Sequence, residues 1–304
     1  MAVDYGVEAL GTRPSSKLGG SAVRVLTLNV LALEHAGGEE RHAALAADLP
    51  GLGADVVALQ EVTRSAGRDQ ARELLGVDYS IVDHLGFSAD GVGACLASRW
   101  PVRPLGSTSF AALCAPGGLS WAGAVAVEVI APPPLGRVVV VHHKPSWQLD
   151  RERERERQAV AASGFIDEVT RGLGEVPVVV LGDFDAAPDA ASLRFWTGLQ
   201  SLDGVSVRYE SAWDAVHPGE PGFTFSPANP LVRAGEMPLE RGRRIDQVLV
   251  RCGAHGPALE VVDCRLVFDA PRDGVWISDH FGVVADLERP ARAPGDRACS
   301  QGGR

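Results

Sequence analysis

Hydrophobic residues along this chain gather in short, nearly continuous runs that end on a polar residue or at a turn. Runs rich in Val, Leu and Ala and bounded by Gly, Pro or Asp are typical of strands that are buried on both faces. A run that alternates apolar and polar positions indicates a strand with one face toward water. We therefore predict strands at residues 23–30, 55–62, 91–99, 125–129, 137–143, 178–181 and 244–250, and a last strand entered through residues 275–287.

Three segments carry a helical pattern instead. Residues 39–49 place their apolar side chains on one side, and residues 150–170 and 190–199 also favour helices. Arg and Glu alternate over residues 151–157, which we interpret as a solvated helix face rather than a phosphate-binding one. Strand, helix and strand in succession indicate an α/β unit.

The two ends of the chain differ in composition from the rest. Residues 1–22 are rich in Gly, Ser and Pro, and residues 289–304 are rich in Pro, Arg and Gly. We expect a flexible N-terminal arm and a disordered C-terminal tail, with one domain at residues 23–288 between them. We find no internal repeat, no Gly-rich phosphate loop and no dinucleotide fingerprint.

The composition is that of a globular protein, and it narrows the choice of partners. The 304 residues are 45% hydrophobic and carry a net charge of −10 at pH 7. Proteins that bind long polyanions are usually basic, so nucleic acid is possible as a partner but not favoured. Five cysteines without close pairs argue for reduced thiols and a cytoplasmic location. We expect no secretory signal, and no apolar run approaches the ~18 residues that span a bilayer.

The stretch at residues 178–189 carries the clearest chemistry. A buried strand reaches Gly182 and is followed by Asp183 and Asp185, two acids that point to the same side if the strand continues. Burying two carboxylates is costly unless each finds a cation, a hydrogen-bond donor or water. A simple Gly-Asp turn without chemistry is the alternative.

Polar residues also end several other predicted strands, and together these ends indicate a site assembled from several loops. Their oxygen ligands favour a hard cation, Mg²⁺ or Mn²⁺. Two histidines beside acids suggest metal-assisted attack of water on a phosphoester. The strand-end residues are Asn29, Glu61, His143, Asp183 with Asp185, and Asp279 with His280.

These residues lie in the motifs Leu-Thr-Leu-Asn29, Leu-Gln-Glu61-Val, His143, Gly-Asp183-Phe-Asp185, Arg-Ile-Asp246 and Ser-Asp279-His280. In order and spacing, the motifs resemble the endonuclease/exonuclease/phosphatase superfamily, which includes DNase I-like nucleases, neutral sphingomyelinases and inositol-polyphosphate 5-phosphatases. The resemblance covers about residues 23–288. It implies an α/β fold of four layers, a sandwich of two mostly antiparallel β-sheets packed face to face with helices outside.

The resemblance also implies how a metal and water would be held. It makes Glu61 the principal ligand of Mg²⁺ or Mn²⁺, with Asn29 and Asp279 nearby. It assigns to Asp183 the orientation and deprotonation of the attacking water.

Two histidines receive roles from the same resemblance. His280, held by Asp246, would contact the scissile phosphate and stabilise charge in the transition state. His143 would protonate the leaving oxygen or steady the phosphoryl group. Only one of His142 and His143 can point inward from a strand, and the resemblance favours His143.

Asp185 departs from the family pattern, which usually has Asn at this position. An amide can donate a hydrogen bond to a phosphate oxygen, whereas an ionised carboxylate can only accept one. Asp185 is therefore protonated, binds a metal or faces a different group, and we group it with the catalytic residues.

The sequence thus predicts a metal-dependent phosphoesterase that acts on a small or lipid-like phosphoester. A DNase-like nuclease with the same chemistry is the first alternative. A non-catalytic binding module on the same fold is the second, although loss of catalysis should have removed several acids and histidines that are all present. The sequence leaves open monoester or diester preference and oligomeric state.

Overall fold

The computed structural model describes residues 22–290 of the chain. The predicted arm at residues 1–22 lies outside this range except for Ala22, which is the first residue of the first strand. The predicted tail at residues 289–304 lies outside it except for its first two residues.

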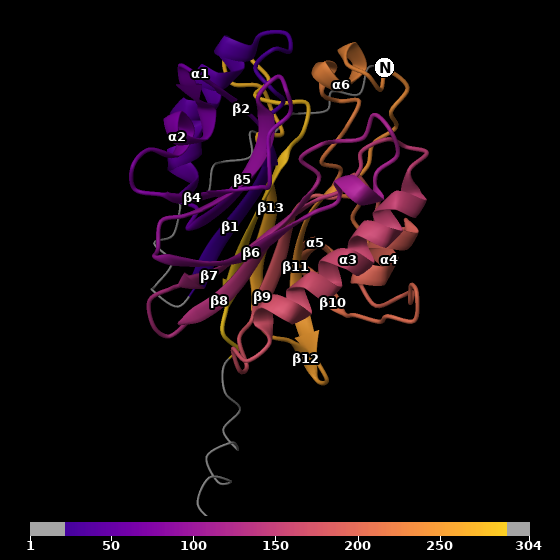
Figure 1. The fold of residues 1–304 in the computed structure, drawn as a ribbon. Helices are drawn as coiled ribbons and strands as arrows, with labels where there is room; N and C mark the ends of the chain where they lie inside the picture. The colour runs from indigo at the N-terminus through magenta and orange to yellow at the C-terminus, as the bar shows by residue number, and fades with distance from the viewer. Residues whose placement is uncertain (1–21, 291–304) are drawn as a thin grey trace, which may run out of the picture.

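Two seven-stranded sheets pack against each other (Figure 1). In the first sheet the strand order is β13-β14-β1-β2-β5-β4, with β3 paired to β2. Its strands are β1 Ala22–Asn29, β2 Val56–Ser65, β3 Arg68–Asp69, β4 Ser80–Asp83, β5 Val92–Ser98, β13 Glu260–Val267 and β14 Gly282–Glu288.

The second sheet has the order β10-β11-β9-β8-β7-β6, with β12 paired to β11. Each sheet has one parallel pair near its centre, β1 with β2 and β8 with β9, and the other pairings are antiparallel. The strands are β6 Val102–Ser109, β7 Gly123–Ile130, β8 Arg137–Lys144, β9 Val178–Asp183, β10 Tyr209–Ser211, β11 Asp246–Gly253 and β12 Gly256–Pro257.

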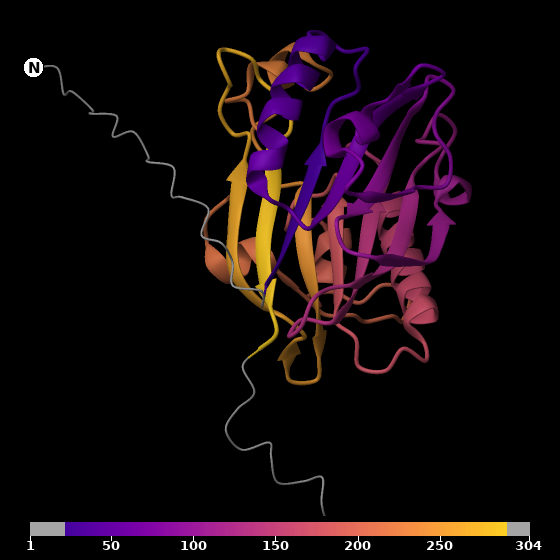
Figure 2. The same ribbon diagram turned by 90° about the vertical axis from the view of Figure 1, so that its left-hand side faces the viewer.

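Helices cover the outer faces of the sandwich, which is plain when the molecule is turned (Figure 2). The helices α1 and α2 pack on the first sheet, and α3 and α4 pack on the second. This arrangement confirms the predicted α/β sandwich of four layers. The helices are α1 Gly38–Asp48, α2 Gln70–Leu75, α3 Glu152–Thr170, α4 Ala191–Trp196, α5 Ala212–Val216 and α6 Pro230–Ala234, with 3-10 turns η1 Leu49–Leu52 and η2 Ala111–Leu113.

Side chains of β8 show how the strands divide between the apolar layers. Val138 and Val140 point into the layer between the two sheets, and Val139 and Val141 point into the layer under α3. Each such side chain contributes about 1.5–3 kcal/mol when it is fully buried. Because alternate residues must keep alternate faces, the register of β8 also fixes which of its last residues face the interior between the sheets.

Two further findings concern membrane-spanning helices and the cysteines. Among residues 22–290, no helix is long and apolar enough to cross a membrane. The four cysteines in the same part of the chain, Cys95, Cys114, Cys252 and Cys264, are free thiols.

Candidate active site

The polar strand ends converge on one pocket of about 390 Å³. Its lining includes residues of α6 and of the loop before α1. Both elements lie at the same end of the sandwich (Figure 1). Six of the eight predicted site residues line it directly, Asp246 lies behind His280, and His143 lies elsewhere. The charged and amide groups on its floor are Asn29, Glu61, Lys144, Asp183, Asp185, Asp279 and His280.

A bulge in β2 presents Glu61 to the pocket. Gln60 pairs with Ala94 and Val62 with Gly93, so Glu61 is an extra residue without a partner in β5. Its backbone has a φ of 60°, a left-handed conformation that is unfavourable for a residue with a side chain. Strand β2 is buried from Val56 to Gln60, and the bulge then leaves the Glu61 side chain half-buried at the pocket floor.

Glycine is required where β9 reaches the site. A Cβ atom on Gly182, whose φ is 151°, would lie 2.1 Å from the backbone oxygen of His143. Without a side chain at this position, β8 and β9 can approach closely. Lys144 at the end of β8 therefore lies beside Asp183 at the end of β9.

Asp183 is held by three hydrogen-bond donors. Its Oδ2 accepts from Lys144 Nζ at 2.6 Å and from Asn29 Nδ2 at 3.1 Å, and its Oδ1 accepts from the Asp185 backbone N–H at 3.1 Å. Burial alone would raise the pKa of Asp183. The charges of Lys144 and His280, together with these hydrogen bonds, lower that pKa to about 2. Asp183 is therefore ionised over the whole neutral range.

Asp185 pairs with the same ammonium group. Its backbone is also left-handed, with a φ of 51°, which Asp tolerates better than most residues. Lys144 donates to Asp185 as well as to Asp183. Burial, and then the neighbouring charge of Asp183, raise the pKa of Asp185 to about 6 despite that donor.

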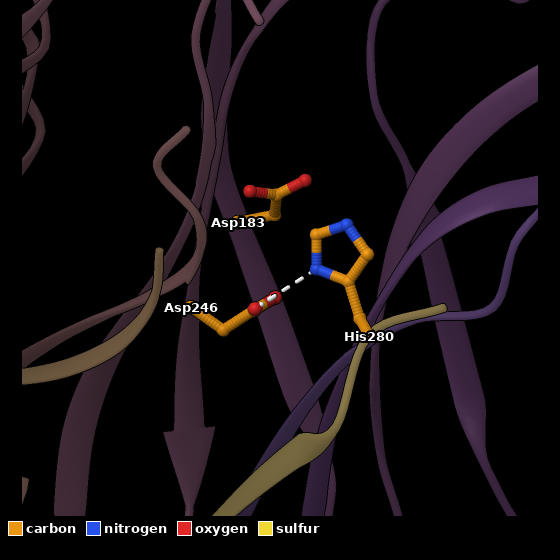
Figure 3. A group of neighbouring side chains, drawn as sticks. All are labelled: Asp183, Asp246 and His280. Carbon is orange, nitrogen blue, oxygen red and sulfur yellow. Dashed lines mark hydrogen bonds and ion pairs between the residues drawn. The ribbon is translucent and has the colours of Figure 1, made fainter. Parts of the chain in front are cut away.

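His280 and Asp246 form a buried pair (Figure 3). The distance from His280 Nδ1 to Asp246 Oδ2 is 2.9 Å. Burial opposes protonation, but the charges of Asp246 and Asp183 outweigh it and raise the pKa of His280 to about 10. The imidazole is therefore a cation, whose Nε2 is left as a hydrogen-bond donor. Its ring packs on Phe225 at a centroid distance of 4.9 Å.

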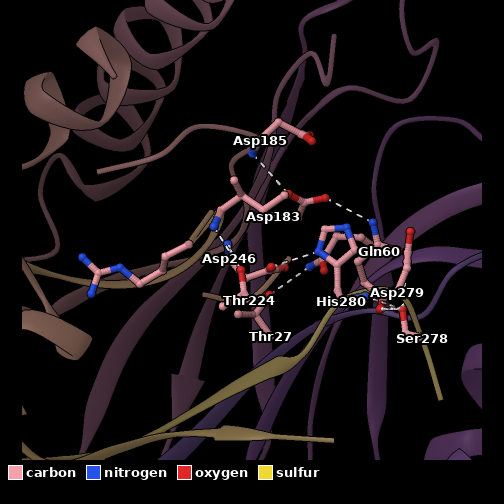
Figure 4. Close-up of polar contacts among 12 residues, drawn as sticks. Thr27, Gln60, Asp183, Asp185, Thr224, Asp246, Ser278, Asp279 and His280 are labelled. Carbon is pink, nitrogen blue, oxygen red and sulfur yellow. Dashed lines mark hydrogen bonds and ion pairs between the residues drawn. The ribbon is translucent and has the colours of Figure 1, made fainter. Parts of the chain in front are cut away.

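A second set of hydrogen bonds fixes the backbone under this pair (Figure 4). Thr224 Oγ1 accepts from the Asp246 N–H at 3.1 Å. Ser278 Oγ donates to the Asn29 backbone oxygen at 2.7 Å and so joins the loop before β14 to the end of β1. The neighbouring Asp279 is half-buried, and desolvation followed by the charge of Glu61 raises its pKa.

Asn29 presents its amide nitrogen, not its oxygen, to the acids. Nδ2 donates to Glu61 Oε1 at 2.8 Å and to Asp183 Oδ2 at 3.1 Å. Oδ1 accepts from the Leu31 backbone N–H at 3.0 Å. The structure thus brings Asn29 to the predicted place, but in the orientation of a hydrogen-bond donor to carboxylates.

Several acids and a histidine meet closely enough to suggest a divalent-metal site. Ligand atoms of Asp183, Asp246 and His280 all lie within 4.8 Å of one another. A protonated imidazole has no free lone pair, however, and Nδ1 of His280 is already bonded to Asp246. The oxygens of Glu61 and Asp279 are the better candidates, because these two like charges face the same pocket.

His143 is not brought to the pocket, and this corrects the placement expected from the sequence. It lies on the α3 face of β8, where its ring packs against Phe110, Phe184 and Trp196 at centroid distances of 5.4, 4.8 and 5.6 Å. His142 faces the interior between the sheets, but its Nε2 is bonded to Gln60 at 2.6 Å, below the pocket floor. Neither histidine lines the pocket.

Lys144 occupies the place that the sequence analysis gave to a histidine. Strand β8 runs one residue beyond the prediction, so Lys144 shares a face with His142 and its side chain reaches the acids. The signal in the sequence was a lysine directly after the Val-rich strand and its two histidines, followed by Pro145.

Arg41 was also missed, and it shapes one edge of the pocket. Its buried guanidinium donates to the backbone oxygens of Val30, Ala32 and Ala36 at 3.0, 2.9 and 3.0 Å. These bonds hold the loop after β1, whose residues form part of the pocket wall. Burial lowers the pKa of Arg41, and the bonds to carbonyl groups compensate for the desolvation of its charge.

The walls of the pocket differ in character from its floor. Three exposed acids, Glu34, Asp90 and Glu236, stand among the lining residues. The Lys and Arg side chains that line the pocket in the described part of the chain are Lys144 and Arg243, and Arg243 is paired with Glu240 at 2.8 Å. Large apolar side chains form much of the wall, namely Leu31, Leu119, Trp121, Trp147, Val232 and Met237.

A sandwich of two mixed sheets, with acids and an Asp–His pair at one end of its strands, together with the family match over residues 26–280, places the protein among the phosphoester hydrolases. The model of the Endonuclease/Exonuclease/phosphatase family matches residues 26–280, and the chain belongs to that family. No curated protein sequence matches the chain.

Solved structures with the same fold have low sequence identity to this chain. TDP2 from D. rerio, complexed with a single-strand DNA product, is 18% identical with a TM-score of 0.64, over 88% of this chain and 99% of that one. The human Nocturnin catalytic domain, with a bound sulfate anion, is 19% identical with a TM-score of 0.65, over 88% and 94%. An endonuclease/exonuclease/phosphatase from Bacteroides vulgatus is 19% identical with a TM-score of 0.64, over 88% of this chain and 99% of that one.

Proposed function

We propose that this protein is a divalent-metal-dependent hydrolase of small phosphoesters that carry an apolar group. The observation that carries the proposal is the pocket itself, which combines a charged floor with an apolar wall. A pocket of about 390 Å³ has room for one compact ligand. The floor would hold the phosphoryl group, and Trp121 and Trp147 would contact the apolar part of the ester.

Glu61 and Asp279 would hold the metal ion, for which Mg²⁺ or Mn²⁺ is the expected choice because the ligands are oxygens. The fit rests on two acids that face the same pocket, where burial and Glu61 raise the pKa of Asp279. Nearby like charges of this kind are relieved by a cation. When bound, the ion would supply Lewis-acid polarisation of the phosphoryl oxygen and a more acidic water.

Asp183 would orient the attacking water. Three donors fix its carboxylate, and the charges of Lys144 and His280 lower its pKa to about 2. Asp183 is therefore a weak proton acceptor and a firmly held hydrogen-bond acceptor. Its contribution is therefore to align the water more than to remove its proton.

His280 would stabilise the phosphoryl oxygens. Asp246 fixes the ring through Nδ1, which leaves the Nε2–H of a charged imidazole as donor. A donor of this kind gains strength where negative charge develops in the transition state. No role in the reaction is assigned to His143.

The acidic surroundings of the pocket favour a small substrate over a nucleic acid. Glu34, Asp90 and Glu236 would repel further phosphates of a long chain, and the protein as a whole carries a charge of −10. The nuclease alternative keeps support from the fold, because TDP2 was solved with a single-strand DNA product.

Hydrolysis of a panel of phosphoesters, measured with Mg²⁺ and with a chelator, tests the proposal. The panel contains nitrophenyl monoesters and diesters, glycerophosphodiesters and single-strand DNA. We expect cleavage of at least one small ester that stops in chelator and returns with Mg²⁺ or Mn²⁺. Cleavage of DNA alone would favour the nuclease alternative, and cleavage that persists in chelator would refute metal dependence.

The variant Glu61→Gln should lose metal affinity by about tenfold or more, because one charged ligand becomes neutral. Calorimetric titration with Mg²⁺ measures the loss, and thermal unfolding checks the fold. Glu40→Gln is the matched control, since Glu40 is exposed on α1. Equal metal affinity in the two variants would remove Glu61 from the metal site.

A further inference from the structure

Lys144 is an unusual residue in this chain, because lysine is rare in it. The sequence has 29 Lys and Arg residues in total, and Lys17 and Lys144 are its two lysines. Lys144 ends β8 with a side chain that is 2% exposed, and it lines the pocket beside Asp183, which is 1% exposed. A buried lysine at this place requires an explanation beyond solubility.

Two carboxylates fix the Lys144 ammonium. Nζ donates to Asp183 Oδ2 at 2.6 Å and also to Asp185. An ammonium has three N–H groups, so one remains without a partner among residues 22–290. Asp183 ends β9 and Asp185 follows it by two residues, so both ion-pair partners of the ammonium come from one short segment of the chain.

The chemistry of Asp185 explains why a cation is needed here. Family resemblance led us to expect an amide at this position, which could donate to a phosphate oxygen. A carboxylate cannot donate while ionised, and its charge opposes an anionic ligand. Lys144 supplies both the missing donor and the compensating charge.

We propose that Lys144 is a phosphate-binding residue of this site, whose third N–H donates to a non-bridging oxygen of the phosphoryl group. Asp185 is its positioning residue, which holds Nζ through the ion pair. Both statements rest on the proposed function, because they take a phosphoester as the ligand. The ammonium suits the place because it is a compact point charge, whereas a guanidinium presents its donors in a planar fork.

A merely structural ion pair predicts a different outcome. If Lys144 served only to neutralise two buried acids, its loss would lower stability and leave the phosphate affinity of the folded protein unchanged. If Lys144 binds phosphate, the affinity falls in protein that is still folded. In that case removal of the Asp185 charge restores part of the affinity when Lys144 is absent.

Calorimetric titration with inorganic phosphate, at fixed Mg²⁺ concentration, tests the proposal without catalysis. Lys144→Met should bind phosphate about 10- to 100-fold more weakly than the wild type, the range for one lost hydrogen bond to a charged group. Lys144→Arg keeps the charge, and its phosphate affinity should lie between those of the wild type and Lys144→Met. The double variant Lys144→Met/Asp185→Asn should bind more tightly than Lys144→Met.

Arg153→Met is the control for net charge, since Arg153 is exposed on α3, and it should bind phosphate as the wild type does. Thermal unfolding and near-UV circular dichroism show which variants are folded, and the double variant provides a folded comparison if Lys144→Met alone is unstable. Wild-type affinity in Lys144→Met, no gain in the double variant, or a wild type that fails to bind millimolar phosphate would each overturn the proposal.

The two proposals fail separately. If no ester of the panel is cleaved, while phosphate binds and depends on Lys144, the proposed hydrolase function is wrong and the binding role stands. If esters are cleaved and phosphate affinity does not depend on Lys144, the binding role is wrong and the hydrolase function stands.

Discussion

At the scale of single residues, three buried histidines affect how the protein responds to acid. His84 follows β4, and His142 and His143 lie in β8. Burial, the largest cause in each case, lowers the pKa of His84 to about 4 and that of His143 to about 3, and it lowers the pKa of His142 well below its usual value. An unfolded chain binds protons on these rings below about pH 6.5, whereas the folded chain does not. Stability is therefore present above that pH and is lost as the pH falls toward 3.

His143→Leu should make the protein more resistant to acid. The variant removes one neutral ring from an apolar layer, where its Nδ1 has no partner in the described part of the chain. The free energy of unfolding, measured with urea, should rise relative to the wild type by about 1–2 kcal/mol more at pH 5 than at pH 7.

The same variant tests the position of His143. The rate of hydrolysis at neutral pH should remain within about twofold of the wild-type rate, because the variant removes no group that contacts the transition state. A hundredfold loss in folded protein would show that His143 takes part in the reaction after all.

Most residues of the site could be predicted because each is a polar residue at the end of a buried strand, where an apolar residue or a turn is expected. Asn29 ends an apolar strand, Asp183 follows a buried one, and Asp279 precedes another, so their polarity stands out in the sequence. His143 and Lys144 could not be assigned in this way, because both are polar and adjacent. Because side chains alternate along a strand, only one of these two neighbours can face the pocket. The strand continues through Lys144, and Lys144 is the one that does.

At the scale of elements, the close contact of β8 with β9 positions Lys144 and Asp183 on the pocket floor. Gly182→Ala should destabilise the protein by about 2 kcal/mol or more and reduce hydrolysis. The new Cβ would lie 2.1 Å from the His143 oxygen, which neither strand can accept without moving. Urea unfolding and initial rates measure the two effects.

Gly164→Ala is the matched control for this prediction. Gly164 lies within α3, and an added Cβ there would meet nothing within 4 Å. Alanine favours helices over glycine by about 1 kcal/mol, so this variant should be more stable than the wild type. A Gly182→Ala variant that is equally stable would contradict the tight contact between the strands.

Elements buried on both faces were the predictable ones. Strands such as β1, β5 and β9 are mostly apolar and buried along their whole length, which gives them a clear pattern. Strands β4, β6 and β13 were missed because most of their side chains are partly exposed. Tertiary pairing, rather than a local pattern, makes them strands.

At the scale of the whole molecule, charge should set the affinity for nucleic acid. Fluorescence anisotropy without divalent metal should show weak binding to duplex DNA at physiological salt, because a protein with a net charge of −10 releases few counterions. Affinity should also depend little on salt. Submicromolar binding with a steep salt dependence would reveal a basic surface and would support the nuclease alternative.

The pairing of β1 with β14 has a consequence for the synthesis of the protein. Ala22 lies opposite Glu288 in the first sheet, so β1 has as its neighbour a strand that is synthesised about 260 residues later, β14. Until residue 288 is free, one edge of β1 has no partner, and an unpaired edge is open to other chains. The first sheet can therefore close only after translation of the domain is complete, and truncated chains should aggregate rather than fold.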